Sequence, residues 1–300
     1  MIAKLEMFIA LARERHFGRA AESLGITQPT LSAGIKQLEE TLGVQLVLRG
    51  SRFGGLTPEG QRALIHARTI IGETKHLRQD MRFSREGLSG DVRLAVIPTA
   101  LTWASKLTAR FTQAHPKVTF TILSRATVDI VEILENFEID VGMTYLDQGP
   151  LGRVMTQGIY RESYALVCHK ESENARQAAV EWADVAKLNL CLLTPDMQNR
   201  RIINRAFLDA GLDPKVGMES NSTVVLTSHT ETGQWATVLP VDLARTLAAG
   251  RALSVVPIRA QNALEPSVGL VAPHQDPQTP VLKAIFDQAL TLSTSRLAAG

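Results

Sequence analysis

The chain contains little cysteine: Cys168 and Cys191 are the only two in 300 residues. Two cysteines are too few for the disulfide framework of a secreted protein. An apolar run of about 18 residues is also missing, so the sequence predicts no membrane-spanning helix. Charges at Lys4 and Glu6 interrupt the first residues, which therefore lack the apolar core of a signal peptide. These absences predict a cytoplasmic protein with no membrane partner.

Signatures of common enzyme classes are missing as well. The sequence has no HExxH zinc motif, no phosphate-binding P-loop and no GxSxG nucleophile elbow. Cys168 and His169 are adjacent, but neighbouring side chains on a strand point to opposite faces and cannot pair. We therefore expect no enzyme activity, no catalytic residue, no metal and no cofactor. A redox pair between Cys168 and Cys191 stays open as an alternative.

Composition and charge indicate a globular protein with more than one domain. Apolar residues make up 45% and charged residues 21% of the chain, as in soluble globular domains. A length of 300 residues exceeds that of one ordinary domain. Residues 1–90 hold 13 Lys and Arg against 9 Asp and Glu, whereas residues 91–300 hold 19 against 21. The N-terminal third is therefore the better partner for a polyanion.

The N-terminal sequence predicts three helices. A helix over 2–14 is followed by one over about 18–24, which ends at Gly25, a residue type that tolerates the positive φ of a tight turn. Thr27 is a suitable cap for a third helix, and Pro29 falls within its first turn, where the missing N–H costs nothing. The apolar stripe of this third helix is narrow and consists of Leu31, Ile35, Leu38 and Leu42.

The opposite face of the third helix is small and polar. In a helix-turn-helix, the second helix of the motif enters the major groove of DNA with side chains that read bases. Gln28 can pair with adenine, and Lys36 suits a phosphate or guanine. Thr30 and Ser32 can bond bases or phosphates. Spacing alone leaves one alternative open, an ordinary helical hairpin with a solvated face.

Residues 44–56 (VQLVLRGSRFGGL) predict two short strands around a basic, glycine-rich turn. A hairpin of this kind beside a helix-turn-helix would form a wing. Arg49 and Arg52 at the turn can hold the adjacent DNA backbone or a narrow minor groove.

A long helix is predicted next. Thr57, Pro58 and Glu59 make a strong helix start, and the helical pattern continues to about Glu86. Apolar or small residues repeat along it with a period of seven, which is typical of a helix–helix seam. The repeat comprises Ala63, Ala67, Ile70, Thr74, Leu77, Met81 and Ser84. Because the helix has nothing in its own chain to pack on over this length, we expect a second copy as its partner.

From Asp91 onward strands alternate with helices, which predicts two α/β lobes. The first set is a parallel β-α-β-α-β unit, with strands 91–97, 118–124 and 139–145 and helices over about 102–114 and 127–137. The second set has strands 164–169, 188–193, 216–220 and 235–240 and helices 196–210 and 222–231. The strand 267–273 and the helix 279–298 return to the first set. Two lobes joined by crossover strands form a cleft, where ligands bind at the carboxyl ends of strands.

Polar residues at these strand ends and helix starts are candidates for a ligand site. Thr99 and Ala100 follow the first strand, just before a helix whose free N–H groups favour an anion. Thr127 is either a plain helix cap or a second cleft hydroxyl, and Thr144 ends the third strand. The other lobe offers Gln198, Asn199, Arg200, Ser222 and Thr223. Arginines such as Arg200 and Arg201 are usually solvated, but one that turns inward would pair with an anion.

The chain resembles the LysR-type transcriptional regulators over its whole length. The matching segments are FGRAAESLGITQPTLSAGIKQLEETLGVQLVLR, LTPEG, IPTA, HPKV, FEIDVGM and the VLP at 238–240. The resemblance implies an α/β protein with a winged helix-turn-helix DNA-binding domain at 1–58, a linker and dimerisation helix at 59–89 and a two-lobed, periplasmic-binding-protein-like (type 2) effector domain at 90–300. Lobe I would comprise about 90–162 and 266–300, and lobe II about 163–265.

The resemblance also implies the partners. These are double-stranded promoter or operator DNA, a small-molecule effector, further copies of the chain in dimers and homotetramers, and RNA polymerase. The implied DNA contacts are Gln28, Pro29, Thr30, Ser32, Ala33, Lys36, Arg49 and Arg52. A solute-binding protein for a transporter would share the two-lobed fold but would not carry residues 1–58. A redox-sensing or effector-independent regulator of the same fold is the alternative function.

Departures from the family pattern qualify these expectations. The family often has an arginine where Ala33 stands, which puts its usual half-site preference in doubt. Gly34 is unusual because a glycine in mid-helix costs roughly 1 kcal/mol relative to alanine. Trp235 replaces a glycine and is expected to fill space near the cleft. Together with the polar candidates, Trp235 favours a small anion as the effector.

Overall fold

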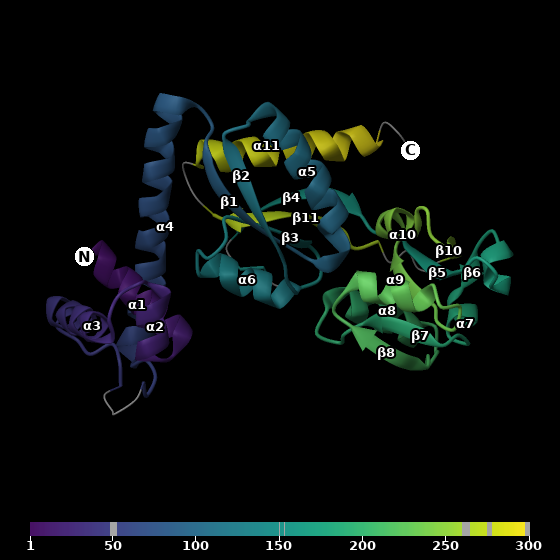
Figure 1. Ribbon diagram of the computed structural model, residues 1–300, viewed down its shortest axis with the longest axis horizontal. Coiled ribbons are helices and arrows are strands. Elements are labelled where there is room, and N and C mark those ends of the chain that lie inside the picture. Colours follow the sequence, from purple (N-terminus) through teal and green to yellow (C-terminus); the bar gives the residue numbers. More distant parts are fainter. Residues whose placement is uncertain (49–52, 150, 153, 260–264, 275–277, 298–300) are drawn as a thin grey trace. The chain divides into compact units, whose positions relative to one another are not determined.

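The computed structural model describes residues 1–48, 53–149, 151–152, 154–259, 265–274 and 278–297 (Figure 1). The chain forms two compact units, Met1–Gly87 with Glu135–Phe137, and Leu88–Leu134 with Glu138–Gly300. Among the described residues, none of the helices combines the length and apolar character needed to cross a membrane.

The first unit is built from four helices. They are α1 (Ile2–Glu14), α2 (Phe17–Ser23), α3 (Gln28–Leu42) and α4 (Pro58–Glu86). The expected bounds agree to within about one residue because the caps are local signals. Thr27 Oγ1 accepts from Thr30 N–H at 3.3 Å, and Thr57 Oγ1 accepts from Gly60 N–H at 2.9 Å. Both predicted helix caps are therefore confirmed.

Two glycines let the helices of this unit approach closely. A Cβ at Gly34 would overlap the sulfur of Met7, which packs from α1 onto α3. This contact accounts for the unusual mid-helix glycine. A Cβ at Gly60 would overlap the backbone carbonyl of Leu46, so the start of α4 rests directly on the strand that follows α3.

The expected wing is only partly formed as a pair of strands. In the described part of 44–56, a single bridge joins Val47 to Leu56. The reason lies in Glu39 of α3, whose Oε1 accepts from Leu46 N–H at 2.8 Å and from Val47 N–H at 3.1 Å. The carboxylate takes the Leu46 N–H, a donor that a longer ladder would have used, and it holds Leu46 and Val47 against α3.

The second unit contains two lobes, each with its own sheet. We call lobe I the part around the five-stranded sheet of order β2-β1-β3-β11-β4. Its strands are β1 (Gly90–Val96), β2 (Val118–Ser124), β3 (Val141–Tyr145), β4 (Val154–Arg161) and β11 (Ser267–Pro273). β1 pairs in parallel with β2 and β3, and β11 pairs antiparallel with β3 and β4. The parallel unit and the return of the 267–273 strand are confirmed.

Helices cover both faces of the lobe I sheet. α5 (Leu101–Ala114) and α11 (Pro280–Leu297) pack together on one face, and α6 (Thr127–Glu135) covers the other (Figure 1). A short turn, η1 (Pro98–Ala100), joins β1 to α5. The residue after β1 therefore starts a helical segment at the carboxyl end of the sheet, as the sequence predicts.

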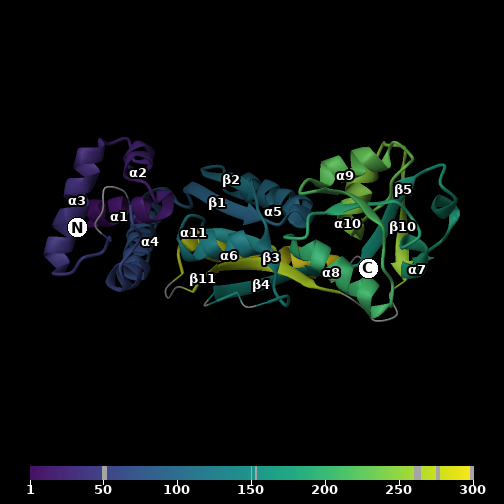
Figure 2. The same ribbon diagram turned by 90° about the horizontal axis from the view of Figure 1, so that it is seen from below.

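Lobe II surrounds a four-stranded sheet of order β6-β10-β5-β9 and a two-stranded sheet β7-β8. Its strands are β5 (Tyr164–His169), β6 (Val180–Glu181), β7 (Leu190–Leu193), β8 (Val216–Ser220), β9 (Thr237–Pro240) and β10 (Leu253–Arg259). Its helices are η2 (Glu173–Arg176), α7 (Trp182–Val185), α8 (Gln198–Asp209), α9 (Thr223–Thr230) and α10 (Val241–Ala248). α9 and α10 lie side by side against β5 (Figures 1 and 2).

The chain crosses between the two sheets after β4 and again before β11. The crossings lie side by side, since Glu162 N–H donates to the Pro266 carbonyl at 3.0 Å. This pair of crossovers is the feature that positions the site in the second unit. It brings Glu162 to the place where the two lobes meet.

Candidate functional site

The third helix, α3, separates apolar from polar residues as expected, except that Leu42, the last residue of the predicted apolar stripe, is exposed. Leu31, Ile35 and Leu38 are buried in the core of the first unit. The described DNA-contact candidates are all exposed: Gln28, Pro29, Thr30, Ser32, Ala33 and Lys36. The candidates Arg49 and Arg52 lie outside the described residues. The first turns of α3 thus present a contiguous polar surface.

Two of the exposed α3 side chains already have partners. Thr30 Oγ1 lies 2.9 Å from Thr27 Oγ1, so its hydroxyl supports the helix cap. Lys36 Nζ lies 3.8 Å from Glu40 Oε1, with both side chains well exposed. Exposed pairs of this kind are weak and give way readily to a phosphate. Lys36 therefore remains available for DNA.

The effector candidates divide into two groups of contacts. Thr144 Oγ1 donates to Thr127 Oγ1 at 3.0 Å, so these two hydroxyls form a pair at the end of β3 and the start of α6. Thr99 is 2% exposed, and its Oγ1 lies 3.4 Å from the hydroxyl of Tyr145 at the end of β3. Ala100 is buried beside it.

Asn199 brings lobe II to the same tyrosine. It is the second residue of α8 and is 3% exposed, and its Nδ2 donates to Tyr145 Oη at 3.3 Å. Its Oδ1 is buried without a hydrogen-bond partner. Thr99 and Asn199 belong to different lobes, and each is a candidate site residue from the sequence. Their side chains thus contact the same hydroxyl group, that of Tyr145. Gln198, Ser222 and Thr223 lie at the starts of α8 and α9.

Arg200 turns inward and pairs with a carboxylate, but that carboxylate belongs to the protein itself. Its Nη1 donates to the Leu193 carbonyl at 2.7 Å and to Glu219 Oε1 at 2.8 Å. Its Nε donates to Asn204 Oδ1 at 2.8 Å. The carboxylate that pairs with this buried guanidinium belongs to lobe II itself. Arg200 therefore holds α8 on β7 and β8, and its guanidinium is already paired with Glu219.

Trp235 also lies elsewhere than expected. Its ring packs on the backbone of Gly217, where a Cβ would come within 2.8 Å of the ring. Gly217 and Trp235 lie beside the amino-terminal end of β7, since Leu190 pairs with Val216 and bridges to Ala236. Asn199 follows the carboxyl end of that strand. Trp235 therefore packs at the end of β7 opposite to Asn199. From there it does not limit the size of an effector bound at Asn199.

A buried carboxyl group, not predicted from the sequence, lies at the lobe junction. Glu162 is 2% exposed. Its Oε2 accepts from Tyr145 Oη at 2.9 Å and from Tyr164 Oη at 3.1 Å, and its Oε1 accepts from Tyr160 Oη at 3.4 Å. The lobe-junction cluster therefore consists of Thr99, Tyr145, Tyr160, Glu162, Tyr164 and Asn199. It joins both lobes and both crossover strands.

Burial governs the protonation of the lobe-junction cluster. Loss of solvation raises the pKa of Glu162 from 4.5 to about 7, although hydrogen bonds from Tyr145 and Tyr164 oppose the change. Burial and the nearby carboxyl raise the pKa of Tyr145 and Tyr160 well above 10. The same causes raise the pKa of Tyr164. The phenols therefore stay protonated and act as donors near neutral pH.

A small cavity adjoins the cluster. It has a volume of about 10 Å³, which is room for roughly one water molecule. Its walls carry the polar groups of Thr99, Tyr160, Arg161, Glu162, Ser163 and Asp242. One wall is Trp103, whose ring stacks on Tyr160 at a centroid distance of 4.6 Å. Thr99 is the candidate ligand residue that lines this cavity, together with Glu162.

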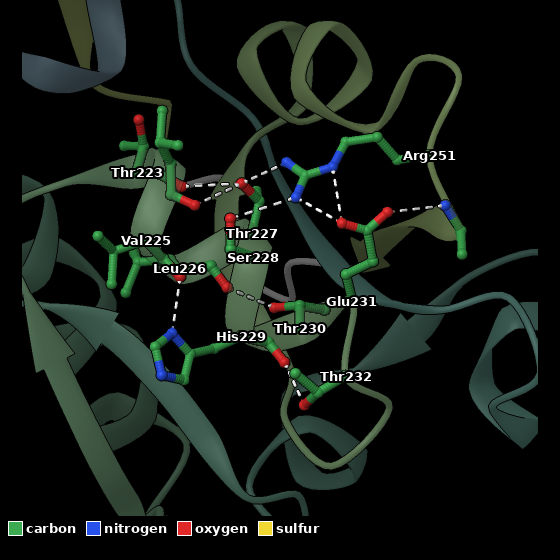
Figure 3. A network of polar contacts seen from close by, with 12 residues as sticks. Thr223, Val225, Leu226, Thr227, Ser228, His229, Thr230, Glu231, Thr232 and Arg251 are labelled. Carbon is green, nitrogen blue, oxygen red and sulfur yellow. Dashed lines mark hydrogen bonds and ion pairs between the residues drawn. The ribbon is translucent and has the colours of Figure 1, made fainter.

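A polar network in lobe II fixes the far end of α9 (Figure 3). Arg251 donates from Nε and Nη2 to Glu231 Oε2 at 3.1 and 2.7 Å, and from Nη1 to Thr227 Oγ1 at 2.9 Å. The guanidinium lowers the pKa of Glu231. Glu231 Oε1 accepts in turn from Ala252 N–H at 3.3 Å. The network ties α9 to the turn before β10 and so holds Ser222 at the other end of that helix.

Both thiols are poorly suited to redox chemistry. Cys168 and Cys191 are free and buried, and burial raises the pKa of each. The Cys191 thiol donates to backbone carbonyls of Leu226 and Ala236, each at 3.5 Å. Because the thiolate is the reactive form, these surroundings disfavour oxidation. No cluster of His, Cys, Asp and Glu suited to a metal ion occurs in the described part of the chain.

Comparison with known proteins defines the class to which this architecture belongs. Residues 2–61 match the model of the bacterial regulatory helix-turn-helix proteins of the LysR family, and residues 85–293 match the LysR substrate binding domain. The second match alone spans more than half of the chain. The chain therefore belongs to the LysR family, and it is a DNA-binding transcriptional regulator with an effector-binding domain.

Individual relatives agree with this assignment. The HTH-type transcriptional regulator YfeR of Shigella flexneri is 27% identical over 255 residues, 85% of this chain and 82% of that protein. Full-length OxyR from Pseudomonas aeruginosa has a similar fold, with a TM-score of 0.74, 22% identity and coverage of 96% and 94% of the two chains. CbnR, solved in complex with its target DNA, gives a TM-score of 0.65 at 20% identity, covering 97% and 99%.

Proposed function

We propose that the exposed face of α3 reads operator DNA in the major groove, and that a small molecule at the lobe junction controls this binding. The observation that carries the DNA assignment is the division of α3 into a buried stripe and a polar face that begins at its capped N-terminus. That end of the helix reads bases in helix-turn-helix proteins. The target-DNA complex of CbnR, a protein of similar fold, supports the proposal.

The roles of individual side chains follow from their chemistry. Gln28 is suited to adenine, and Ser32 to a base edge or phosphate in the next turn. Lys36 lies farther along the helix and suits a phosphate. Glu39 would contribute indirectly, because it holds the hairpin that carries the arginines of the wing.

Substitutions on α3 test this assignment. Gln28→Ala and Ser32→Ala should each weaken binding to the operator by roughly 1–3 kcal/mol and leave binding to a random duplex nearly unchanged. Fluorescence anisotropy with both duplexes at one salt concentration measures the difference. Gln37→Ala is the matched control, since Gln37 is exposed on the same helix but outside the proposed contacts. Equal losses on both duplexes would contradict base readout.

Assembly through α4 is the second part of the proposal. Ile70, Leu77 and Met81 of the seven-residue repeat are 43%, 61% and 56% exposed. Near them an apolar groove of 480 Å³ is lined by residues of α1, α3 and α4, including Leu5, Leu42 and Ile70. We propose that α4 of a second copy covers this surface, and that two such dimers form a tetramer.

Control by an effector is the third part. Thr99 and Asn199 come from different lobes and contact the same tyrosine, so a ligand between them would change how the lobes engage. A ligand shifts the equilibrium between two arrangements of the lobes only by the difference in its affinity for them. The shift would alter the dimer–dimer arrangement, DNA bending and contact with RNA polymerase. Neither turnover of the ligand nor a cofactor is part of this function, which we assign to the cytoplasm.

The redox alternative has a direct test. Because both thiols are buried and protonated, we expect no disulfide between Cys168 and Cys191 after treatment with peroxide. Mass spectrometry of the full chain under denaturing, thiol-blocking conditions measures this. A peroxide-dependent disulfide that alters operator binding would favour the redox regulator instead.

A further inference from the structure

The lobe junction holds a carboxyl group where an anion-binding site needs a cation. Glu162 contacts the same tyrosine as Thr99 and Asn199. Around the adjoining cavity, Glu162 and Asp242 supply two carboxyl groups against the guanidinium of Arg161. Nη1 of that arginine donates to the Glu265 carbonyl at 3.1 Å. When Glu162 is ionised, this environment disfavours a further anion.

The hydrogen bonds at Tyr145 set the orientation of Asn199. A phenol has a single hydrogen to donate, and the short 2.9 Å contact assigns it to Glu162 when that carboxyl is ionised. Tyr145 Oη must then accept from Asn199, so the amide turns its Nδ2 toward the tyrosine. Oδ1 is left buried without a partner. Such a group gains from any donor that reaches it.

The carboxyl group of Glu162 lies nearby. A carboxylate has about four acceptor positions, and three tyrosine hydroxyls occupy three of those of Glu162. Thr99 supplies a further side-chain hydrogen bond to the same carboxyl group. Asn199 Oδ1 is therefore the acceptor of the lobe-junction cluster that lacks a partner.

We propose that the effector is a small molecule that carries N–H donors and no negative charge, an amine, amidine or amide, in place of the small anion suggested by the sequence. This proposal rests on the proposed function, which assigns the effector to Thr99 and Asn199. A donor on the ligand would satisfy Asn199 Oδ1, and a positive charge would add an attraction to Glu162 when that carboxyl group is ionised.

Three probes of equal size separate the ligand classes. Formate, formamide and formamidinium each have three heavy atoms in a similar planar arrangement, with two oxygens, one oxygen and one nitrogen, or two nitrogens on the carbon. They carry a negative charge, no charge and a positive charge. Each is added as a salt or neutral solute to the full chain, with potassium chloride at matched ionic strength as the blank. Formamidinium should raise the thermal midpoint most and formamide less, and formate should leave it unchanged.

Variants locate the bound probe. Asn199→Leu should abolish the shift caused by formamidinium, and Asn199→Asp should retain it because an acceptor oxygen remains. Asn189→Leu is the matched control: Asn189 is exposed and precedes β7, at the end opposite to α8. Far-ultraviolet circular dichroism establishes that each variant is folded before the midpoints are compared.

The pH dependence gives a readout specific to Glu162. The titratable or charged groups that face this carboxyl are Tyr145, Tyr160 and Tyr164, with Arg161 and Asp242 across the cavity. The tyrosines stay protonated near neutral pH. Affinity for formamidinium should rise by at most about tenfold from about pH 6 to about pH 8, as the carboxyl ionises. Glu162→Gln should remove that rise.

The outcomes test the proposed ligand class and the proposed location of the site separately. If formate causes the largest shift and Asn199→Leu abolishes it, the class is wrong and the site stands. If the shift survives in both Asn199→Leu and Thr99→Val, the proposed effector site is itself wrong. If none of the three probes raises the midpoint, the proposal of a donor-bearing ligand is overturned. The DNA-binding assignment is judged separately by Gln28→Ala.

Discussion

Glu162 gives the sharpest test of the reasoning about the lobe junction. Burial raises the pKa of its carboxyl from 4.5 to about 7. Because the pKa is higher in the folded than in the unfolded chain, protonation of Glu162 stabilises the folded chain in full below about pH 4.5. This stabilisation is lost as the pH rises to about 7. The difference between the two pKa values corresponds to roughly 3 kcal/mol of the free energy of unfolding.

Glu162→Gln removes this titration and keeps the size of the side chain. From about pH 5 to about pH 8, the wild type should lose roughly 2–3 kcal/mol more of its free energy of unfolding than the variant does. Urea unfolding of the full chain, followed by circular dichroism at both pH values, measures the difference. Other titrating groups are common to both proteins and cancel.

Glu265→Gln is the control, because Glu265 is exposed and lies beside the second crossover strand. It should leave the pH dependence of the wild type unchanged. Parallel stability curves for wild type and Glu162→Gln would refute the claim that burial raises the pKa of this carboxyl group in the folded chain.

Two further predictions concern the first unit. Gly60→Ala should destabilise the chain by about 1–3 kcal/mol in urea unfolding, because the new Cβ meets backbone that cannot yield. Gly34→Ala should change stability by no more than about 1 kcal/mol, since the flexible Met7 side chain can move and alanine favours a helix. Ile70→Asp with Leu77→Asp should give smaller species in sedimentation velocity and weaker binding to a two-half-site operator; an unchanged tetramer would exclude α4 as the dimer seam.

Much of the fold is predictable because its signals are local. Thr27 and Thr57 cap their helices through hydrogen bonds to residues three positions ahead, and such spacing is visible in the sequence. The elements that escaped prediction lack these signals. β4 is an edge strand with mixed apolar and polar residues, and α10 has only eight residues. Neither offers the long periodic run on which a prediction from sequence depends.

Only some residues of the lobe-junction cluster could be predicted from the sequence. Thr99 and Asn199 stand at helix starts near the carboxyl ends of strands, a position that is recognisable in a sequence. Glu162 occupies a crossover, and its three phenol partners come from β3, β4 and β5. Contacts among such separate elements depend on the tertiary arrangement. A glutamate flanked by tyrosines two residues away on each side was the one available signal.

The difference between Asn199 and Arg200 shows why the ligand class could not be predicted with the site. Successive residues of a helix point about 100° apart, so only one of the two faces the junction. The sequence offers both and does not say which way α8 is rotated about its axis. In the structure the arginine pairs with Glu219 on β8 at 2.8 Å, and the amide of Asn199 donates to Tyr145. Under the proposed assignment, the ligand therefore meets the amide and not the guanidinium, and this difference in orientation changes the ligand class that we propose.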